Sequence, residues 1–259
     1  MRIPAFIKIS SSPPKRAWPS VYKKELKTLK EIGKKFERSG SLYLTGSAAG
    51  REEAEKVNDL DLIMIVKDSK KIYSAKKLTE RYRKIEGVEI PITYQFWPLD
   101  WVKSITEYDV SPILGPVYLT YVKTNHLHLG GEEVLEKIDW PTKRLIRESA
   151  IRSVKQAILE IFKLIDLSHS TKKENYLLLK YIREVVFKSV FAKFYFGFSK
   201  SEIIKLFLQK YRLQNNKPIK IFYKTRIHGK EYFFNQDPKR LQNSTLVFAQ
   251  EMWNKIERI

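Results

Sequence analysis

Residues 44–63 read LTGSAAGREEAEKVNDLDLI, and they contain two polar motifs enclosed by apolar segments. The segments at 42–44 and at 59–66, DLDLIMIV, are apolar enough to predict two strands of one sheet. Asp59 and Asp61 are two residues apart at the start of the second strand, so their carboxylates are predicted to point the same way. Gly46 and Ser47 directly follow the first strand.

This pattern predicts a site for a metal ion and a phosphorylated ligand. Two neighbouring carboxylates repel each other unless a proton or a cation lies between them. Mg²⁺, or Mn²⁺ in its place, is the expected cation because it prefers oxygen ligands and is usually shared with substrate phosphates. Glycine at position 46 lets backbone N–H groups approach a phosphate, and Ser47 adds a hydroxyl donor. Residues 48–56 are predicted to begin a short helix, and the N-terminus of a helix favours anions. The alternative is that Asp59 and Asp61 simply form the solvent-exposed, acidic beginning of a strand.

The composition excludes several classes of protein. The 259 residues include no cysteine, which excludes a disulfide scaffold, a thiolate zinc site and a cysteine nucleophile. Hydrophobic residues make up 43% of the chain, too many for a disordered protein. The most apolar run, 176–198, is interrupted by charged residues, and the N-terminus is too short in its apolar part for a signal peptide. A cytoplasmic protein without a membrane segment is therefore expected.

The net charge of +20 is unevenly distributed along the chain. Residues 1–40 carry +8 and residues 141–259 carry +15, whereas 41–100 are neutral and 101–140 carry −3. Basic segments around an acidic site suit a polyanionic substrate held with a metal ion. The alternative is that the lysines only keep the chain soluble.

Hydrophobic periodicity predicts an α+β fold with a domain boundary near residue 140. An irregular arm at 1–19 precedes a domain at 20–140 with a small mixed sheet. Its predicted elements are helices at 20–38 and 74–86 and strands at 42–44, 59–66 and 88–97. Residues 141–259 are expected to form a mostly helical domain. The further predicted helices are 99–106, 110–123, 132–138, 142–167, 174–197, 199–211 and 244–257.

Residues 219–234 are predicted to form the one β-hairpin of the second domain. IKIFYKTRI and KEYFF flank His228-Gly229, which resembles a glycine turn. On a strand, Lys220, Phe222, Lys224 and Arg226 would share one face. Basic and aromatic side chains in alternation could contact a nucleic acid, and the alternative is a hairpin packed on the helices.

Gly-Ser, eleven intervening residues and Asp-Leu-Asp-Leu together resemble the signature of the nucleotidyltransferase superfamily typified by DNA polymerase beta. The resemblance is closest to its minimal and kanamycin-type small members. The motif covers residues 42–65, and the predicted strand order extends the match to roughly 20–100. The chain length and the helical second half also suit the kanamycin-type layout.

The resemblance implies an enzyme that moves NMP from a nucleoside triphosphate such as ATP to a hydroxyl and releases pyrophosphate. Gly46 and Ser47 would hold the β- and γ-phosphates, and Asp59 and Asp61 would bind the metal. The family usually adds a third carboxylate on the next strand, where Glu89 is the candidate. The acceptor stays open between an RNA end, a protein side chain and a small molecule, and the site could be completed within one chain or across a dimer.

The chain departs from the family pattern in its basic residues as well. Ala48 and Ala49 stand where many small relatives carry an arginine, which leaves Arg51 as the nearest basic substitute. Lys155, Lys180 and Arg183 lie on predicted helices that could face the cleft and contact a triphosphate. If Glu89 does not reach the metals, a weak or inactive module that binds nucleotide, RNA or a protein partner is the alternative function.

Overall fold

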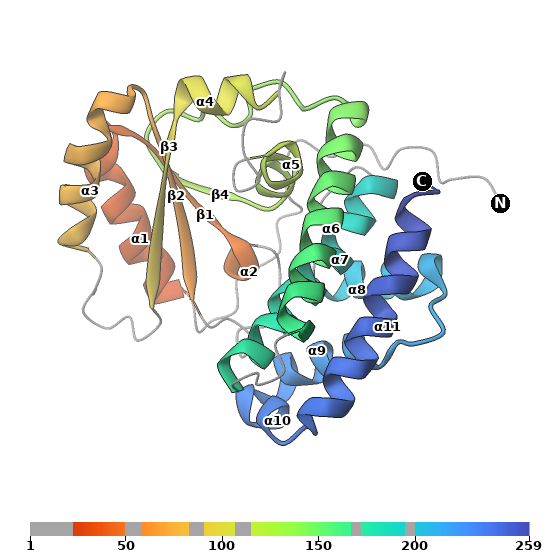
Figure 1. The fold of residues 1–259 in the computed structure, drawn as a ribbon. Helices are drawn as coiled ribbons and strands as arrows, with labels where there is room; N and C mark the ends of the chain where they lie inside the picture. Colours follow the sequence, from red (N-terminus) through yellow and green to blue (C-terminus); the bar gives the residue numbers. More distant parts are fainter. Residues whose placement is uncertain are drawn as a thin grey trace. The chain divides into compact units, whose positions relative to one another are not determined.

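The computed structural model describes residues 23–49, 59–82, 91–106, 115–166, 172–194 and 200–258. It divides into unit 1, Met1–Thr142 with Phe196–Ser199, and unit 2, Lys143–Tyr195 with Lys200–Ile259. The first contains a mixed sheet with helices, and the second contains helices and no strand within its described residues, so the fold is α+β (Figure 1). The arm expected at 1–19 lies outside the described residues.

Unit 1 contains a sheet of four strands in the order β3-β2-β1-β4. The strands are β1 Gly40–Thr45, β2 Leu60–Val66, β3 Ile92–Pro98 and β4 Leu127–Gly130. β1 pairs antiparallel with β2 and β4, whereas β2 and β3 are parallel. The strands predicted at 42–44 and 59–66 are confirmed, and the register of β1 on β2 places Thr45 opposite Asp61.

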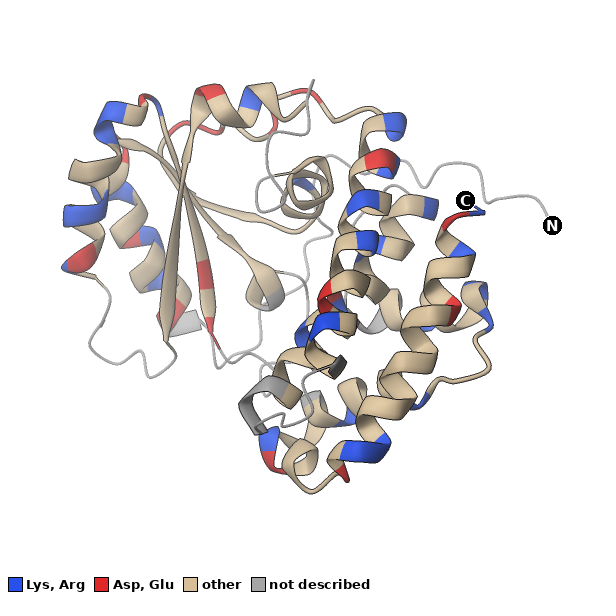
Figure 2. Cartoon of the chain, viewed as in Figure 1, with Lys and Arg blue, Asp and Glu red and all other residues tan. Residues whose placement is uncertain are grey.

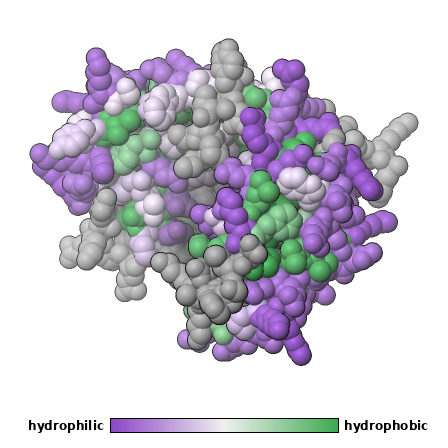
Figure 3. Space-filling model, in the orientation of Figure 1, coloured by the Kyte–Doolittle hydropathy of each residue, from purple (hydrophilic) through white to green (hydrophobic). Residues whose placement is uncertain are grey.

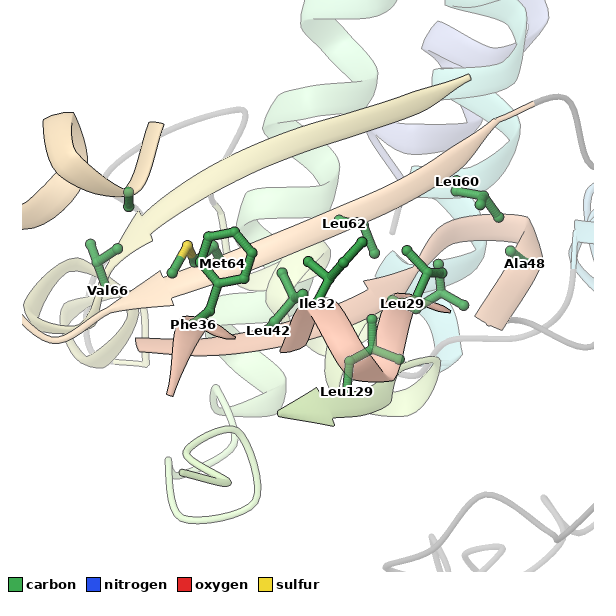
Figure 4. Packing of buried hydrophobic residues seen from close by; sticks show 12 residues of the cluster. Leu29, Ile32, Phe36, Leu42, Ala48, Leu60, Leu62, Met64, Val66 and Leu129 are labelled. Carbon is green, nitrogen blue, oxygen red and sulfur yellow. The ribbon is translucent and has the colours of Figure 1, made fainter. Parts of the chain in front are cut away.

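Two helices cover one face of this sheet. They are α1 Lys23–Phe36 and α3 Ile72–Glu80, which follows the short η3 Ser69–Lys71. Side chains at three- and four-residue steps on α1 meet every second side chain of β2 (Figure 4). This core contains Leu29, Ile32, Phe36, Leu42, Leu44, Leu60, Leu62, Met64 and Val66.

A second core covers the opposite face and explains why β2 is apolar at consecutive positions. Tyr43, Ile63, Ile65 and Trp97 pack there against α4 Leu99–Ser104 and α5 Pro116–Thr124. The helix predicted at 132–138 is wrong. Only a turn forms, in which the backbone N–H groups of residues 137 and 138 donate to the carbonyl of Val134. Val134, Leu135 and Ile138 instead pack as an irregular segment in this core.

Unit 2 is built on two long helices that pack along each other, α6 Lys143–Asp166 and α7 Lys172–Phe194. Four further helices complete it: α8 Lys200–Tyr211, α9 Lys217–His228, α10 Lys230–Phe234 and α11 Pro238–Ile256. An apolar stripe on α6 is buried at Ile146, Val154, Ile158 and Ile161. Within the described ranges, no helix is long and apolar enough to cross a membrane.

The β-hairpin predicted at 219–234 is wrong, because α9 and α10 occupy these residues. Pro218 lies at the start of α9, a position where proline favours a helix. Ile221 and Thr225, four residues apart, are both buried, whereas Tyr223 between them is 41% exposed, so burial follows a helical period and not the alternation of a strand. Gly229 has φ +81° and ends α9 instead of forming a two-strand turn. Tertiary packing has overridden the β-propensity of IKIFYKTRI.

Candidate functional site

Gly46 is the first residue of α2 Gly46–Ala49, the short helix that directly follows β1. Its φ is +71°, in the region that side-chain-bearing residues rarely adopt. A Cβ atom at this position would lie 2.5 Å from Oδ2 of Asp61 and 3.3 Å from its Cγ. Glycine is therefore what lets the Asp61 carboxylate lie directly against the turn between β1 and α2.

The two aspartates lie where β2 begins. Asp61 is the second residue of β2 and is half-buried, whereas Leu60 and Leu62 on either side of it are buried. Thr45 pairs with Asp61 in the sheet and its Oγ1 donates a hydrogen bond to the Asp61 carbonyl, 3.2 Å away. Asp59, also half-buried, immediately precedes the strand. Figure 2 shows this acidic start of β2 beside α2.

The structure thus places Gly46 against the Asp61 carboxylate, where β1 ends and β2 begins, and Asp59 immediately precedes β2. A pair of carboxylates beside a glycine turn suits Mg²⁺, which commonly takes one or two carboxylates and completes its shell with phosphate oxygens and water. Among the residues described here, no group of three or more His, Asp or Glu side chains is placed to hold a metal ion. The residues present fit a metal ion that is shared with a ligand.

The strand beside Asp61 carries no acid in its described part. The parallel register places Thr93 next to Asp61 and Gln95 next to Ile63. Nε2 of Gln95 lies 3.4 Å from the hydroxyl of Tyr118 and donates a hydrogen bond to it. Glu89, the expected third carboxylate, lies outside the described residues, so its role stays a prediction.

Two other predicted phosphate ligands cannot be placed by their side chains. Ser47 belongs to α2, but its side chain is outside what the structure describes, and so is the whole of Arg51. The side chain of Ala48, in contrast, is placed: it is 6% exposed and packs in the core with residues of α1. A long basic side chain at position 48 would have to displace this packing.

The three basic residues predicted to reach the triphosphate all belong to unit 2, and each has neighbours there. Lys155 Nζ lies 3.6 Å from Oε1 of Glu257. Arg183 Nη2 lies 2.8 Å from Oε1 of Glu184. Lys180 is exposed, and its ammonium group lies 5.9 Å from the ring centroid of Tyr181. Their contact with a phosphate stays a prediction.

A polar network that the sequence did not reveal fixes the segment after β4 on the face of the sheet that carries Asp61. The Tyr43 hydroxyl donates to Oε1 of Glu133 at 2.9 Å and accepts from the backbone N–H groups of Val134 at 2.9 Å and Leu135 at 3.3 Å. Burial raises the pKa of Tyr43, so the hydroxyl stays protonated and able to donate. The tyrosine between Leu42 and Leu44 was the available signal.

Lys123 on α5 provides a second anchor for the same segment. Its buried Nζ donates to the carbonyls of Leu135 and Ile138, the latter at 2.6 Å, and lies 4.9 Å from the ring centroid of Trp140. Burial lowers the pKa of Lys123 to about 8, outweighing the nearby carboxylates, of which Glu133 acts most strongly. A neutral amine keeps two N–H donors, so both carbonyls can stay bonded after deprotonation.

The two histidines of NHLHLGG pack around Tyr43. The ring centroids of His126 and His128 lie 5.5 Å and 5.2 Å from that of Tyr43. Nδ1 of His126 is 3.1 Å from the carbonyl of Val122, and Nδ1 of His128 is 3.6 Å from Oε2 of Glu133. These contacts belong to the packing around β1 and β4.

Comparison of the chain with models of protein families gave no match, and comparison with curated proteins gave no significant match.

Proposed function

We propose that unit 1 binds a nucleoside triphosphate with Mg²⁺ or Mn²⁺ and transfers its NMP group to a hydroxyl, releasing pyrophosphate. The observation that carries the proposal is the close contact between Gly46 and the Asp61 carboxylate, with Asp59 two residues away. This contact joins a turn suited to phosphate with two ligands suited to a hard cation. The resemblance of the motif to nucleotidyltransferases supports the same assignment.

Each part of the site has a role in this proposal. Asp59 and Asp61 hold the metal ion, and Gly46 with Ser47 lies along the β- and γ-phosphates. When bound, the metal ion neutralises charge on the phosphates and favours departure of pyrophosphate. The acceptor oxygen forms a bond to the α-phosphorus as the bond to the pyrophosphate oxygen breaks, and Glu89 is proposed to take the acceptor proton.

A second candidate function is nucleotide binding without transfer. It is favoured by Thr93, which occupies the β3 position beside Asp61 and has no carboxylate to offer. In this case the site binds nucleotide and metal as a recognition module, and the acceptor chemistry is absent. The two candidates share the same ligand and differ in whether the bond at the α-phosphorus breaks.

Transfer can be tested with the four nucleoside triphosphates labelled at the α-phosphate. The full chain is incubated with each nucleotide, Mg²⁺ and one of three acceptor types: RNA, protein or aminoglycoside. Label should move to one acceptor with wild type and should fail to move with Asp61→Asn. Asp100→Asn is the matched control, because Asp100 is an exposed aspartate on α4.

The possible results separate the candidates. Transfer that survives unchanged in Asp61→Asn would contradict the site assignment. Metal-dependent nucleotide binding without transfer to any acceptor would favour the second candidate.

A further inference from the structure

The outward face of α9 in unit 2 carries large apolar side chains between lysines. Lys220, Tyr223, Lys224 and Ile227 follow at helical three- and four-residue steps, and all four are exposed. Tyr223 is 41% exposed and Ile227 is 46% exposed. The helix packs on unit 2 through other residues, among them the buried Ile219 and Ile221. On the face of unit 2 seen in Figure 3, hydrophobic side chains likewise lie exposed between hydrophilic ones.

Further rings lie on α10 and at the start of α7, two helices that contact α9. Phe234 is 41% exposed, and its ring centroid lies 6.0 Å from that of Tyr176. Phe233 is buried beside Tyr176, with ring centroids 5.4 Å apart, and so anchors the group. α9 and α10 also contact each other through His228 and Tyr232, with ring centroids 5.7 Å apart. The exposed rings are therefore held by neighbouring rings.

The lysines around these rings lie over aromatic faces. Nζ of Lys224 is 5.9 Å from the ring centroid of Tyr232, and Nζ of Lys230 is 5.6 Å from that of Tyr176. No ion pair is found for Lys220, Lys224 or Lys230 in the described part of the chain. Residues 217–240 contain seven basic and two acidic side chains. This surface combines exposed rings with uncompensated positive charge.

We propose that this basic aromatic surface, formed by Lys220, Tyr223, Lys224, Ile227, Lys230 and Phe234, binds single-stranded RNA. A single strand offers both of the features that the surface complements: phosphates for the lysines and unstacked bases for the rings. A duplex hides the faces of its bases, whereas RNA loops and ends expose them. The inference does not depend on the nucleotide site of unit 1, so either can fail without the other.

The surface differs from the one expected on a hairpin. On α9, Lys220 and Lys224 share a face, but Phe222 is two residues away and half-buried, and the side chain of Arg226 is outside the described structure. Tyr223 and Phe234 take the place of Phe222 as the rings available for stacking.

Binding can be measured by fluorescence anisotropy of a labelled twelve-nucleotide RNA without internal pairing, using the full chain. Tyr223→Ala and Phe234→Ala should each weaken binding roughly 5- to 100-fold, the range typical for removal of one stacked ring. Tyr73→Ala is the matched control: Tyr73 is 78% exposed on lysine-rich α3 of unit 1. It should bind as wild type does. Equal losses for Tyr73→Ala and Tyr223→Ala would overturn the assignment.

The dependence on salt tests the lysines. Replacing Lys220 and Lys224 by glutamine should lower the slope of log affinity against log salt by about 1.4, since each phosphate contact to a single strand contributes about 0.7. The pair Lys76→Gln and Lys77→Gln on α3 should leave the slope unchanged.

Other ligands define what would overturn the proposal. Inorganic polyphosphate that competes as well as RNA would mean that charge alone is bound. Tighter binding of DNA of the same sequence would exclude RNA as the ligand. Binding of vesicles containing phosphatidylserine, or of a glutamate-rich peptide, with no binding of RNA would assign the surface to a membrane or to a protein.

Discussion

Replacing Gly46 by alanine should lower the stability of the fold and, more strongly, weaken ligand binding. The added Cβ would lie 2.5 Å from Oδ2 of Asp61, about 1 Å closer than ordinary van der Waals contact, so the carboxylate must turn away. The positive φ of +71° adds about 1–2 kcal/mol of backbone strain for any residue other than glycine. We therefore expect the free energy of unfolding to fall by about 1–3 kcal/mol.

The expected effect on ligand binding is larger than the effect on stability. A displaced Asp61 leaves Asp59 as the one aspartate of the pair in place, so Mg²⁺-dependent nucleotide binding should weaken at least about tenfold, or 1.4 kcal/mol. Urea unfolding gives the stability, and calorimetric titration with a non-hydrolysable nucleotide and Mg²⁺ gives the affinity. Both use the full chain.

Gly229 offers a matched control for this experiment. Its φ is +81°, but nothing lies within 4 Å of an added Cβ. Gly229→Ala should therefore lower stability by a similar amount and leave nucleotide binding unchanged. If Gly46→Ala keeps wild-type affinity, or if both variants lose affinity equally, the contact between Gly46 and Asp61 does not hold the ligand site together.

Two further predictions concern the anchors of the segment after β4. Tyr43→Phe leaves the buried N–H of Val134 without the hydroxyl that accepts its hydrogen bond at 2.9 Å. The free energy of unfolding, measured by urea titration, should therefore fall by about 1–3 kcal/mol. An unchanged urea midpoint would contradict the role of the hydroxyl. Because the pKa of Lys123 is about 8 in the folded state and 10.5 without the fold, the unfolded state binds more protons between these pH values. The stability of wild type relative to Lys123→Met should therefore rise by about 2 kcal/mol from pH 7.5 to pH 10, and a fall over this range would contradict the burial of the ammonium group.

The sequence was sufficient to predict the structure where a single physical preference dominated. β2 is apolar at consecutive positions because both of its faces are buried, and this pattern predicted a strand of the sheet correctly. The motif also predicted that Gly46 and Asp61 would lie near each other, since the turn after β1 and the start of β2 lie at the same end of two adjacent strands.

Sequence reasoning failed where local preference and packing disagreed. IKIFYKTRI alternates like a strand, but Tyr223, which would share a strand face with the buried Ile221 and Thr225, is 41% exposed, and the segment forms the helix α9. Residues 132–138 have helical spacing, yet the hydroxyl of Tyr43 and the ammonium group of Lys123 bind their backbone and hold them in a turn. Both partners are distant in the sequence, so no local pattern could reveal them.

The most direct test of the nucleotide site is calorimetric titration of non-hydrolysable ATP, CTP, GTP and UTP analogues, with and without Mg²⁺, into wild type and the double variant Asp59→Asn/Asp61→Asn. Wild type should bind at least one analogue only when Mg²⁺ is present, and the double variant should lose that binding while unfolding at a similar urea concentration. Equal binding by both proteins, or binding by wild type that is independent of Mg²⁺, would contradict a metal–nucleotide site at the start of β2.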